Sequence, residues 1–183
     1  ETTIRMILVS FSLPIILLFF LMIQEIFKKS SQSLFNISCT IFGYIWIGVF
    51  INSLVYTRYM AGSNLMLIIF LSVWTCDTCA FFFGKKFGKT KIMPEISPNK
   101  TILGTISGLL GTIIFLLTIS YYNIIELNIL ESFILALITG GISQFGDFFE
   151  SKLKREVNIK DTSNILSGHG GVLDRFDSLS IIA

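Results

Sequence analysis

The chain has 183 residues, of which 52% are hydrophobic and 14% are charged, and its formal net charge is +2. About a quarter of the residues of an ordinary soluble domain are charged, so this composition excludes that class. The mean hydropathy of +0.76 and the 18 phenylalanines indicate an all-α, polytopic integral membrane protein. With so small a net charge, we expect no nucleic-acid partner.

In chain order, five apolar segments have about the 20 residues that a helix needs to cross a bilayer. They cover residues 6–27, 37–56, 65–83, 102–121 and 130–149. A sixth begins near Phe176 and is cut off at Ala183, and the sequence starts at Glu1 rather than at a methionine. We therefore expect five to six transmembrane helices in a chain that is incomplete at both termini.

We interpret residues 1–183 as a single transmembrane catalytic domain, with N-terminal helices in 1–60 and a catalytic region in 61–183. If the helices alternate in direction, the connections 28–36, 84–101 and 150–175 share one side of the membrane. That side holds all of the 14 basic residues except Arg5 and Arg58. The positive-inside rule makes it the cytoplasmic side, and we take a bacterial plasma membrane as the default.

The cytoplasmic loop 84–101 contains five lysines and one glutamate. Gly84, Gly88, Pro94 and Pro98 permit tight turns in it, which can bring backbone N–H groups together. Two interpretations stay open for this loop. Its charge either follows from membrane topology and attraction to anionic headgroups, or it forms a binding surface for a polyanion.

Two carboxylates, Asp77 and Asp147, lie inside apolar segments. A carboxylate there costs about 2.5–3.5 kcal/mol on insertion scales, so such residues usually face a cavity, a partner or a metal ion. Cys76 and Cys79 have CxxC spacing, but no second pair and no histidine lies nearby. We interpret these two cysteines as packing residues rather than zinc ligands.

The stretch Ser167–Asp177, SGHGGVLDRFD, gathers polar chemistry in an otherwise apolar chain. The glycines around His169 let backbone amides approach a phosphate, and His169 itself is a phosphate contact or a turn residue. Asp174 and Asp177 are spaced i, i+3, on one face of a helix. Together with Asp147 they suit one or two Mg²⁺ ions. Positive charge for a triphosphate comes from Lys154, Arg155, Lys160 and Arg175.

From Gly146 onward, the sequence GDFFESKLKREVNIKDTSNILSGHGGVLDRFDS resembles the signature of the phosphatidate cytidylyltransferase family, also called CDP-diacylglycerol synthases. The matching positions are Ser151, Lys154, Arg155, Lys160, Asp161, His169, Gly170, Gly171, Asp174, Arg175 and Asp177. A second stretch, residues 77–104, is similar to another block of the family. The chain departs from the family pattern at Asn99, Leu103 and Ser167.

The resemblance implies transfer of a cytidylyl group from CTP to phosphatidic acid, which gives CDP-diacylglycerol and pyrophosphate. It implies one or two Mg²⁺ ions, with an additional monovalent cation as an option, membrane lipid as surroundings and a homodimer. The implied catalytic residues are Asp147, Asp174, Lys154, Arg155, Lys160, Asp161, His169, Arg175 and Asp177. Among these, the implied metal ligands are Asp147, Asp174 and Asp177. The implied substrate-binding residues are Asp77, Ser97, Lys100, Ser151, Gly170 and Gly171.

Two alternatives remain at this point. A related enzyme could use CTP on an archaeal ether lipid or a polyprenol. A cation transporter could use Asp77 and Asp147, although lysine-rich loops would repel cations at its mouth. The Asp-Gly-x-x-Ala-Arg start of the CDP-alcohol phosphotransferases is absent.

Overall fold

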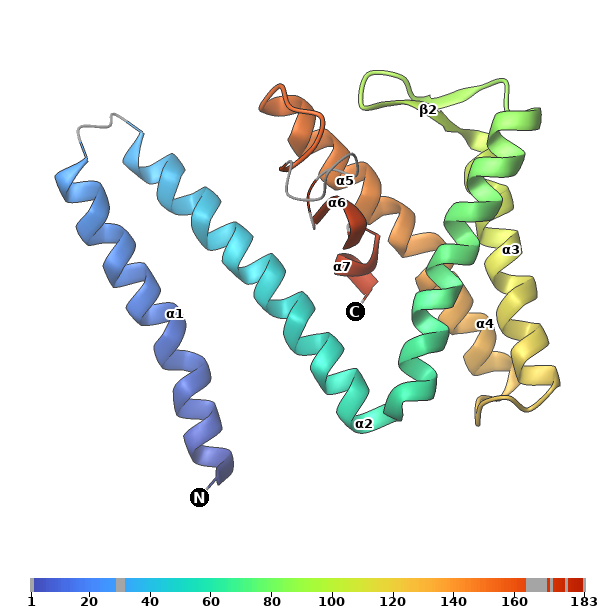
Figure 1. The fold of residues 1–183 in the computed structure, drawn as a ribbon, viewed down its shortest axis with the longest axis horizontal. Helices are drawn as coiled ribbons and strands as arrows, with labels where there is room; N and C mark the ends of the chain where they lie inside the picture. The colour runs from blue at the N-terminus through green and yellow to red at the C-terminus, as the bar shows by residue number, and fades with distance from the viewer. Residues whose placement is uncertain (1, 29–31, 164–170, 172, 177, 183) are drawn as a thin grey trace. The chain divides into compact units, whose positions relative to one another are not determined.

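The computed structural model describes the backbone of residues 2–28, 32–163, 171, 173–176 and 178–182 (Figure 1). Side chains are described for the same residues except 2–13, 173 and 175. His169, Gly170 and Asp177, which were predicted to be site residues, lie outside the described residues. The described part is helical apart from its turns and one small hairpin, so the predicted all-α class is confirmed.

The chain divides into two compact units, Glu1–Val49 and Phe50–Ala183. The first unit contains α1 (Thr2–Phe27) and the beginning of α2 (Ser33–Phe87). Glu25, near the end of α1, accepts hydrogen bonds from Lys28 and from Asn36 in α2, both at 3.2 Å. These contacts join the end of α1 to the start of α2, and α1 confirms the first predicted segment.

The second and third predicted segments, 37–56 and 65–83, lie in one helix, α2, whose interruption falls in the gap between them. The helix continues through this gap and is interrupted only at Gly62, whose φ of 80° and ψ of 176° are not helical. This backbone region is essentially accessible to glycine alone. The helix therefore changes direction at a single residue, without a connecting loop.

The second unit continues with α3 (Ile102–Tyr121), which coincides with the fourth predicted segment. The next segment consists of α4 (Ile129–Leu137), a π-helical turn η1 (Ile138–Ile142) and α5 (Ser143–Glu156). The side chain of Thr101 caps α3, and Asn128 and Glu131 form a capping box at the start of α4. These caps satisfy backbone donors at the helix ends, and residues 122–128 connect α3 to α4.

Small residues let the C-terminal arm of α2 and α3 approach closely. A Cβ added to Gly104 would lie 2.8 Å from the backbone oxygen of Ala80, and one added to Gly108 would lie 2.9 Å from that of Cys76. Cys76 is fully buried and its sulfur is 3.4 Å from the carbonyl oxygen of Gly140 in η1. Cys76 is thus a packing residue, as the sequence predicted.

A hairpin of two short antiparallel strands, β1 (Lys91–Met93) and β2 (Ser97–Thr101), joins α2 to α3 (Figure 1). The predicted loop 84–101 therefore needs a correction, because α2 continues to Phe87 and the remainder is mainly hairpin. Gly84 is helical and packs against Gly104, so it does not form a turn. Helical structure likewise extends into the predicted loop 150–175, as far as Glu156.

The chain ends with two short helices, α6 (Leu173–Phe176) and α7 (Leu179–Ile182). Leu179 packs with Phe50 and Val73 in one of the apolar clusters of the second unit. Three helical stretches among the described residues are long and apolar enough to cross a membrane: Ser33–Phe87, Ile102–Tyr121 and Ile129–Glu156.

Candidate active site

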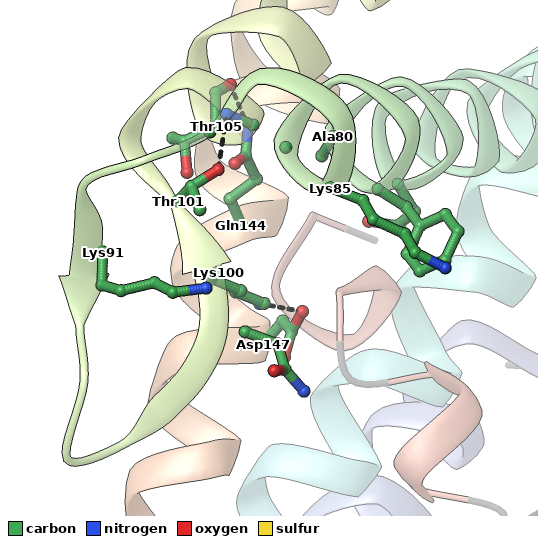
Figure 2. A pocket seen from close by; sticks show the side chains of 14 residues that line it. Ala80, Lys85, Lys91, Lys100, Thr101, Thr105, Gln144 and Asp147 are labelled. Carbon is green, nitrogen blue, oxygen red and sulfur yellow. Dashed lines mark hydrogen bonds and ion pairs between the residues drawn. The ribbon is translucent and has the colours of Figure 1, made fainter.

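A cavity of about 560 Å³ lies where the end of α2, the hairpin, the start of α3 and α5 meet (Figure 2). Its charged lining consists of two carboxylates and three lysines, namely Asp77, Asp147, Lys85, Lys91 and Lys100. The glycines and small residues of the α2–α3 contact form part of its wall. The close helix packing described above therefore shapes this cavity.

Lys100 on β2 and Asp147 on α5 form an ion pair inside the cavity, and Figure 2 shows the lysine pointing toward the carboxylate. The pair joins Lys100 Nζ to Asp147 Oδ2, while the hydroxyl of Ser151, one turn further along α5, donates to Asp147 Oδ1 at 3.3 Å. Lys100 Nζ also lies 4.3 Å from the centre of the Phe148 ring. The carboxylate and the aromatic face together set the position of the lysine, and the hydroxyl holds the carboxylate.

The hairpin lies along α5 through a second contact, in which Arg155 Nε donates to the carbonyl oxygen of Ile96 at 3.4 Å. Asp147 and Arg155 are about 12 Å apart along a helix that rises about 1.5 Å per residue. Ile96 and Lys100 span about 13 Å along an extended strand. The two spacings match, so the strand can follow the helix. The hairpin of the predicted loop 84–101 thus meets the end of α5, where the predicted loop 150–175 begins.

Gln144, one turn before Asp147 on α5, is a cavity residue that the sequence argument missed. Its Nε2 donates to the carbonyl oxygens of Gly140 at 2.6 Å and Thr105 at 3.2 Å. Because both partners are acceptors, the amide orientation is determined, and Oε1 is the group that can accept from a ligand. Lys85 and Lys91 were also missed as individual residues, although the charge of their loop was noted.

A second polar cluster surrounds Asp174 on α6. Its Oδ1 accepts from Lys154 Nζ at 2.7 Å, and its Oδ2 accepts from the backbone amides of Gly171 at 2.7 Å and Thr162 at 2.9 Å and from the Thr162 hydroxyl at 2.8 Å. Burial alone would raise the pKa of this carboxyl group, but the hydrogen bonds outweigh it and hold the pKa well below its usual range. Asp174 is therefore a carboxylate that fastens the segment after α5 to that helix.

The two clusters are connected by one face of α5. Asp147, Ser151 and Lys154 follow one another at spacings of four and three residues, which places them on a common helix face. Glu150, which is buried with 2% exposure, lies 3.5 Å from Lys154 Nζ and belongs to the Asp174 cluster. Glu150 was not among the predicted site residues, although its helical spacing to Asp147 and Lys154 was a usable signal.

Comparison with known proteins identifies the family. The sequence model of the cytidylyltransferase family matches residues 2–183. The chain belongs to the cytidylyltransferase family. It is similar to the phosphatidate cytidylyltransferases of Staphylococcus haemolyticus (strain JCSC1435), at 36% identity, and Staphylococcus aureus (strain COL), at 37%. Each match covers 164 residues, which are 90% of this chain and 63% of the relative. Its apolar helices make this family member an integral membrane protein.

The predicted site residues of this cytidylyltransferase-family chain divide into groups. Asp77, Lys100 and Asp147 line the cavity, and Ser151 contacts Asp147. Lys154 and Gly171 each donate to Asp174 in the second cluster, and Arg155 donates to the backbone oxygens of Ile96 and Ile159. Ser97, Lys160 and Asp161 are described but are not part of the cavity lining, and the side chain of Arg175 lies outside the described residues.

The residues of the cavity fit a magnesium ion that is completed by substrate. Magnesium usually takes one or two carboxylates together with phosphate oxygens and water. Asp147 is 24% exposed, faces the cavity and has the Ser151 hydroxyl beside it, so its oxygens suit this role. Asp174 has fewer acceptor positions to offer, because it already accepts four hydrogen bonds. Among the described side chains, no three His, Cys, Asp or Glu residues are grouped to hold an ion.

Proposed function

We propose that this chain is the catalytic part of a phosphatidate cytidylyltransferase, which transfers a cytidylyl group from CTP to phosphatidic acid. The observation that carries the proposal is the Lys100–Asp147 pair, which joins the two stretches of sequence similar to that family inside one cavity. The curated relatives carry the same activity in their names. The chain spans 63% of their length, so the activity of the whole protein is inferred here.

In the proposed reaction, a phosphate oxygen of phosphatidic acid attacks the α-phosphorus of CTP. A new P–O bond forms, the bond from the α-phosphorus to the bridging oxygen of the β-phosphate breaks, and pyrophosphate leaves with that electron pair. The attacking oxygen is already anionic, so the residues mainly have to position the reactants and neutralise charge. Lys85, Lys91 and Lys100 line the cavity and supply this positive charge.

Asp147 would hold the magnesium ion, which supplies electrostatic stabilisation of the reacting phosphates when it is bound. The chain's own residues position Asp147 and the segment around it. Ser151 orients Asp147 through its hydrogen bond, and the Asp174 cluster fixes the segment that follows α5. Asp77 adds a carboxylate from α2 to the cavity wall.

The proposed topology places the cavity at the cytoplasmic face of a bacterial plasma membrane. CTP would reach it from the cytosol, and phosphatidic acid would reach it sideways while its acyl chains stay in the bilayer. The charge distribution supports this orientation. A homodimer is part of the proposal on the grounds of family resemblance.

The lining of the cavity argues against a cation pathway. Three lysines accompany its two carboxylates, so a passing cation would meet net positive charge. An enzyme that acts on an archaeal ether lipid would use the same chemistry at the α-phosphorus of CTP. A polyprenol kinase would instead transfer the γ-phosphoryl group of CTP to the polyprenol hydroxyl and release CDP. A substrate panel separates these from phosphatidic acid.

The test uses the purified protein in lipid nanodiscs with radiolabelled CTP, Mg²⁺ and, in separate reactions, each lipid acceptor. We expect label to enter a lipid product with phosphatidic acid, together with one pyrophosphate per product. Diacylglycerol, which lacks the attacking phosphate, is the control acceptor and should give no product. Label from the α-phosphate that enters only the ether lipid, or label from the γ-phosphate that enters only the polyprenol, would move the enzyme to that substrate. Ion flux in liposomes without CTP consumption would contradict the proposal.

A further inference from the structure

Both carboxylate oxygens of Asp147 have a partner within the protein. Oδ2 is paired with Lys100 Nζ, and Oδ1 accepts from the Ser151 hydroxyl. The lysine and the aspartate are 29% and 24% exposed, so both can be reached from the cavity that they line. The ammonium group therefore lies at the oxygen that a divalent cation would also use.

A divalent cation and the Lys100 ammonium compete for this oxygen, because two positive charges cannot share it without strong repulsion. A nucleotide changes the balance, since its phosphates offer the lysine several new anionic acceptors. Lysine suits such a move, because its ammonium is a point charge on a flexible stem with three donors. Lys85, another lysine of the cavity, lies over the ring of Phe81 at 5.5 Å and is not placed at Asp147.

We propose that Lys100 is an exchangeable counter-ion of Asp147, which couples binding of the divalent cation to binding of the nucleotide's phosphates. The inference rests on the proposed function for the identity of the nucleotide. With the phosphates present, Lys100 transfers to them and releases Oδ2 to the cation. Without them, Lys100 stays on Asp147 and weakens cation binding. Because coupling is reciprocal, each ligand raises the affinity for the other by the same factor.

The experiment measures Mn²⁺ binding by electron paramagnetic resonance in the detergent-purified protein, with and without α,β-methylene-CTP, an analogue whose α–β bond does not transfer. For the unaltered protein we expect the analogue to raise Mn²⁺ affinity about tenfold or more, within the usual range of coupling. In Lys100→Gln we expect tighter Mn²⁺ binding without the analogue and little further increase with it. Lys100→Arg keeps the charge and should restore weak binding of Mn²⁺ alone.

Lys89→Gln is the matched control, because Lys89 is exposed, belongs to the same connection and is not part of the described cavity lining. It should behave as the unaltered protein does. Equal Mn²⁺ affinity and equal coupling in Lys100→Gln and the unaltered protein would overturn the inference. Asp147→Asn identifies the site. If Asp147→Asn removes Mn²⁺ binding while Lys100→Gln leaves that binding unchanged, only the counter-ion role of Lys100 fails. If Asp147→Asn changes no Mn²⁺ binding, the metal assignment of the proposed function fails as well.

Discussion

Lys100 and Asp147 are 47 residues apart in the sequence and form an ion pair inside the cavity. The pair attaches the strand β2 to the helix α5, and Arg155 attaches the turn of the same hairpin further along that helix. A loop that would otherwise be held only at its ends is thereby positioned over the cavity. The charged lining comes from four different elements, α2, β1, β2 and α5, and none of them forms a site alone.

The carboxylate of Asp147 should be essential for turnover. We expect Asp147→Asn to lower the rate of cytidylyl transfer by at least about a hundredfold, the scale of losing one preorganised electrostatic contact. The amide is nearly the same size, so folding should be retained. Initial rates with CTP and phosphatidic acid, combined with size-exclusion profiles, measure both effects.

Glu156→Gln is the control for this change, because Glu156 is an exposed carboxylate at the end of the same helix. Its activity should stay within about twofold, as expected for a surface charge whose interactions are worth little. Near-normal turnover by Asp147→Asn would remove Asp147 from the proposed site.

Lys154 should matter for stability more than its neighbour Lys152. Lys154 is 12% exposed and lies between Glu150 and Asp174, so Lys154→Ala would leave two carboxylates close together without their shared cation. Removing one partner from a buried ionic group costs about 3–5 kcal/mol. Lys152 is exposed, and Lys152→Ala should cost little. Thermal unfolding of the two variants in the same detergent measures their stabilities. Equal losses of stability would indicate a bulk charge effect.

The contact between α2 and α3 should not tolerate a side chain at Gly108. A Cβ there would lie 2.9 Å from a backbone oxygen of α2, so Gly108→Ala forces the helices apart. Overpacking of this kind costs about 1–3 kcal/mol, and the adjoining cavity should change shape. Gly141→Ala is the control, because its Cβ would make an ordinary contact at 4.0 Å with a leucine side chain. Thermal midpoints that do not differ between the two variants would contradict the close packing.

The change of direction at Gly62 should require glycine. Its backbone conformation costs other residues about 1–3 kcal/mol, so Gly62→Ala should destabilise the protein even though no atom lies within 4 Å of the added Cβ. Gly43→Ala also meets open space, but Gly43 is an ordinary helical residue, and the substitution should be neutral or stabilising. Unfolding midpoints that fall equally in both variants would show that the backbone angle is not the cause.

Apolar length and charge asymmetry predicted the helices well. The fourth segment was predicted to its end residues, because Thr101 and the polar stretch after Tyr121 mark both boundaries in the sequence. The break in α2 falls at Gly62, inside the gap between the predicted segments 37–56 and 65–83, but its form was not predicted. The helix continues through most of that gap and bends at Gly62 alone. A hydropathy pattern reports which surfaces are apolar and does not report where the backbone angles change.

The sequence by itself determined a helical membrane chain and predicted that its basic connections share one side, because bilayer thickness and the cost of moving charge act on local composition. It also selected Asp77, Lys100 and Asp147 as candidate site residues. Only the tertiary structure decided that these three line one cavity, while Lys154 and Asp174 bind each other in a separate cluster. Such pairings depend on how α2, the hairpin and α5 pack, and that packing is set by contacts between residues far apart in the chain.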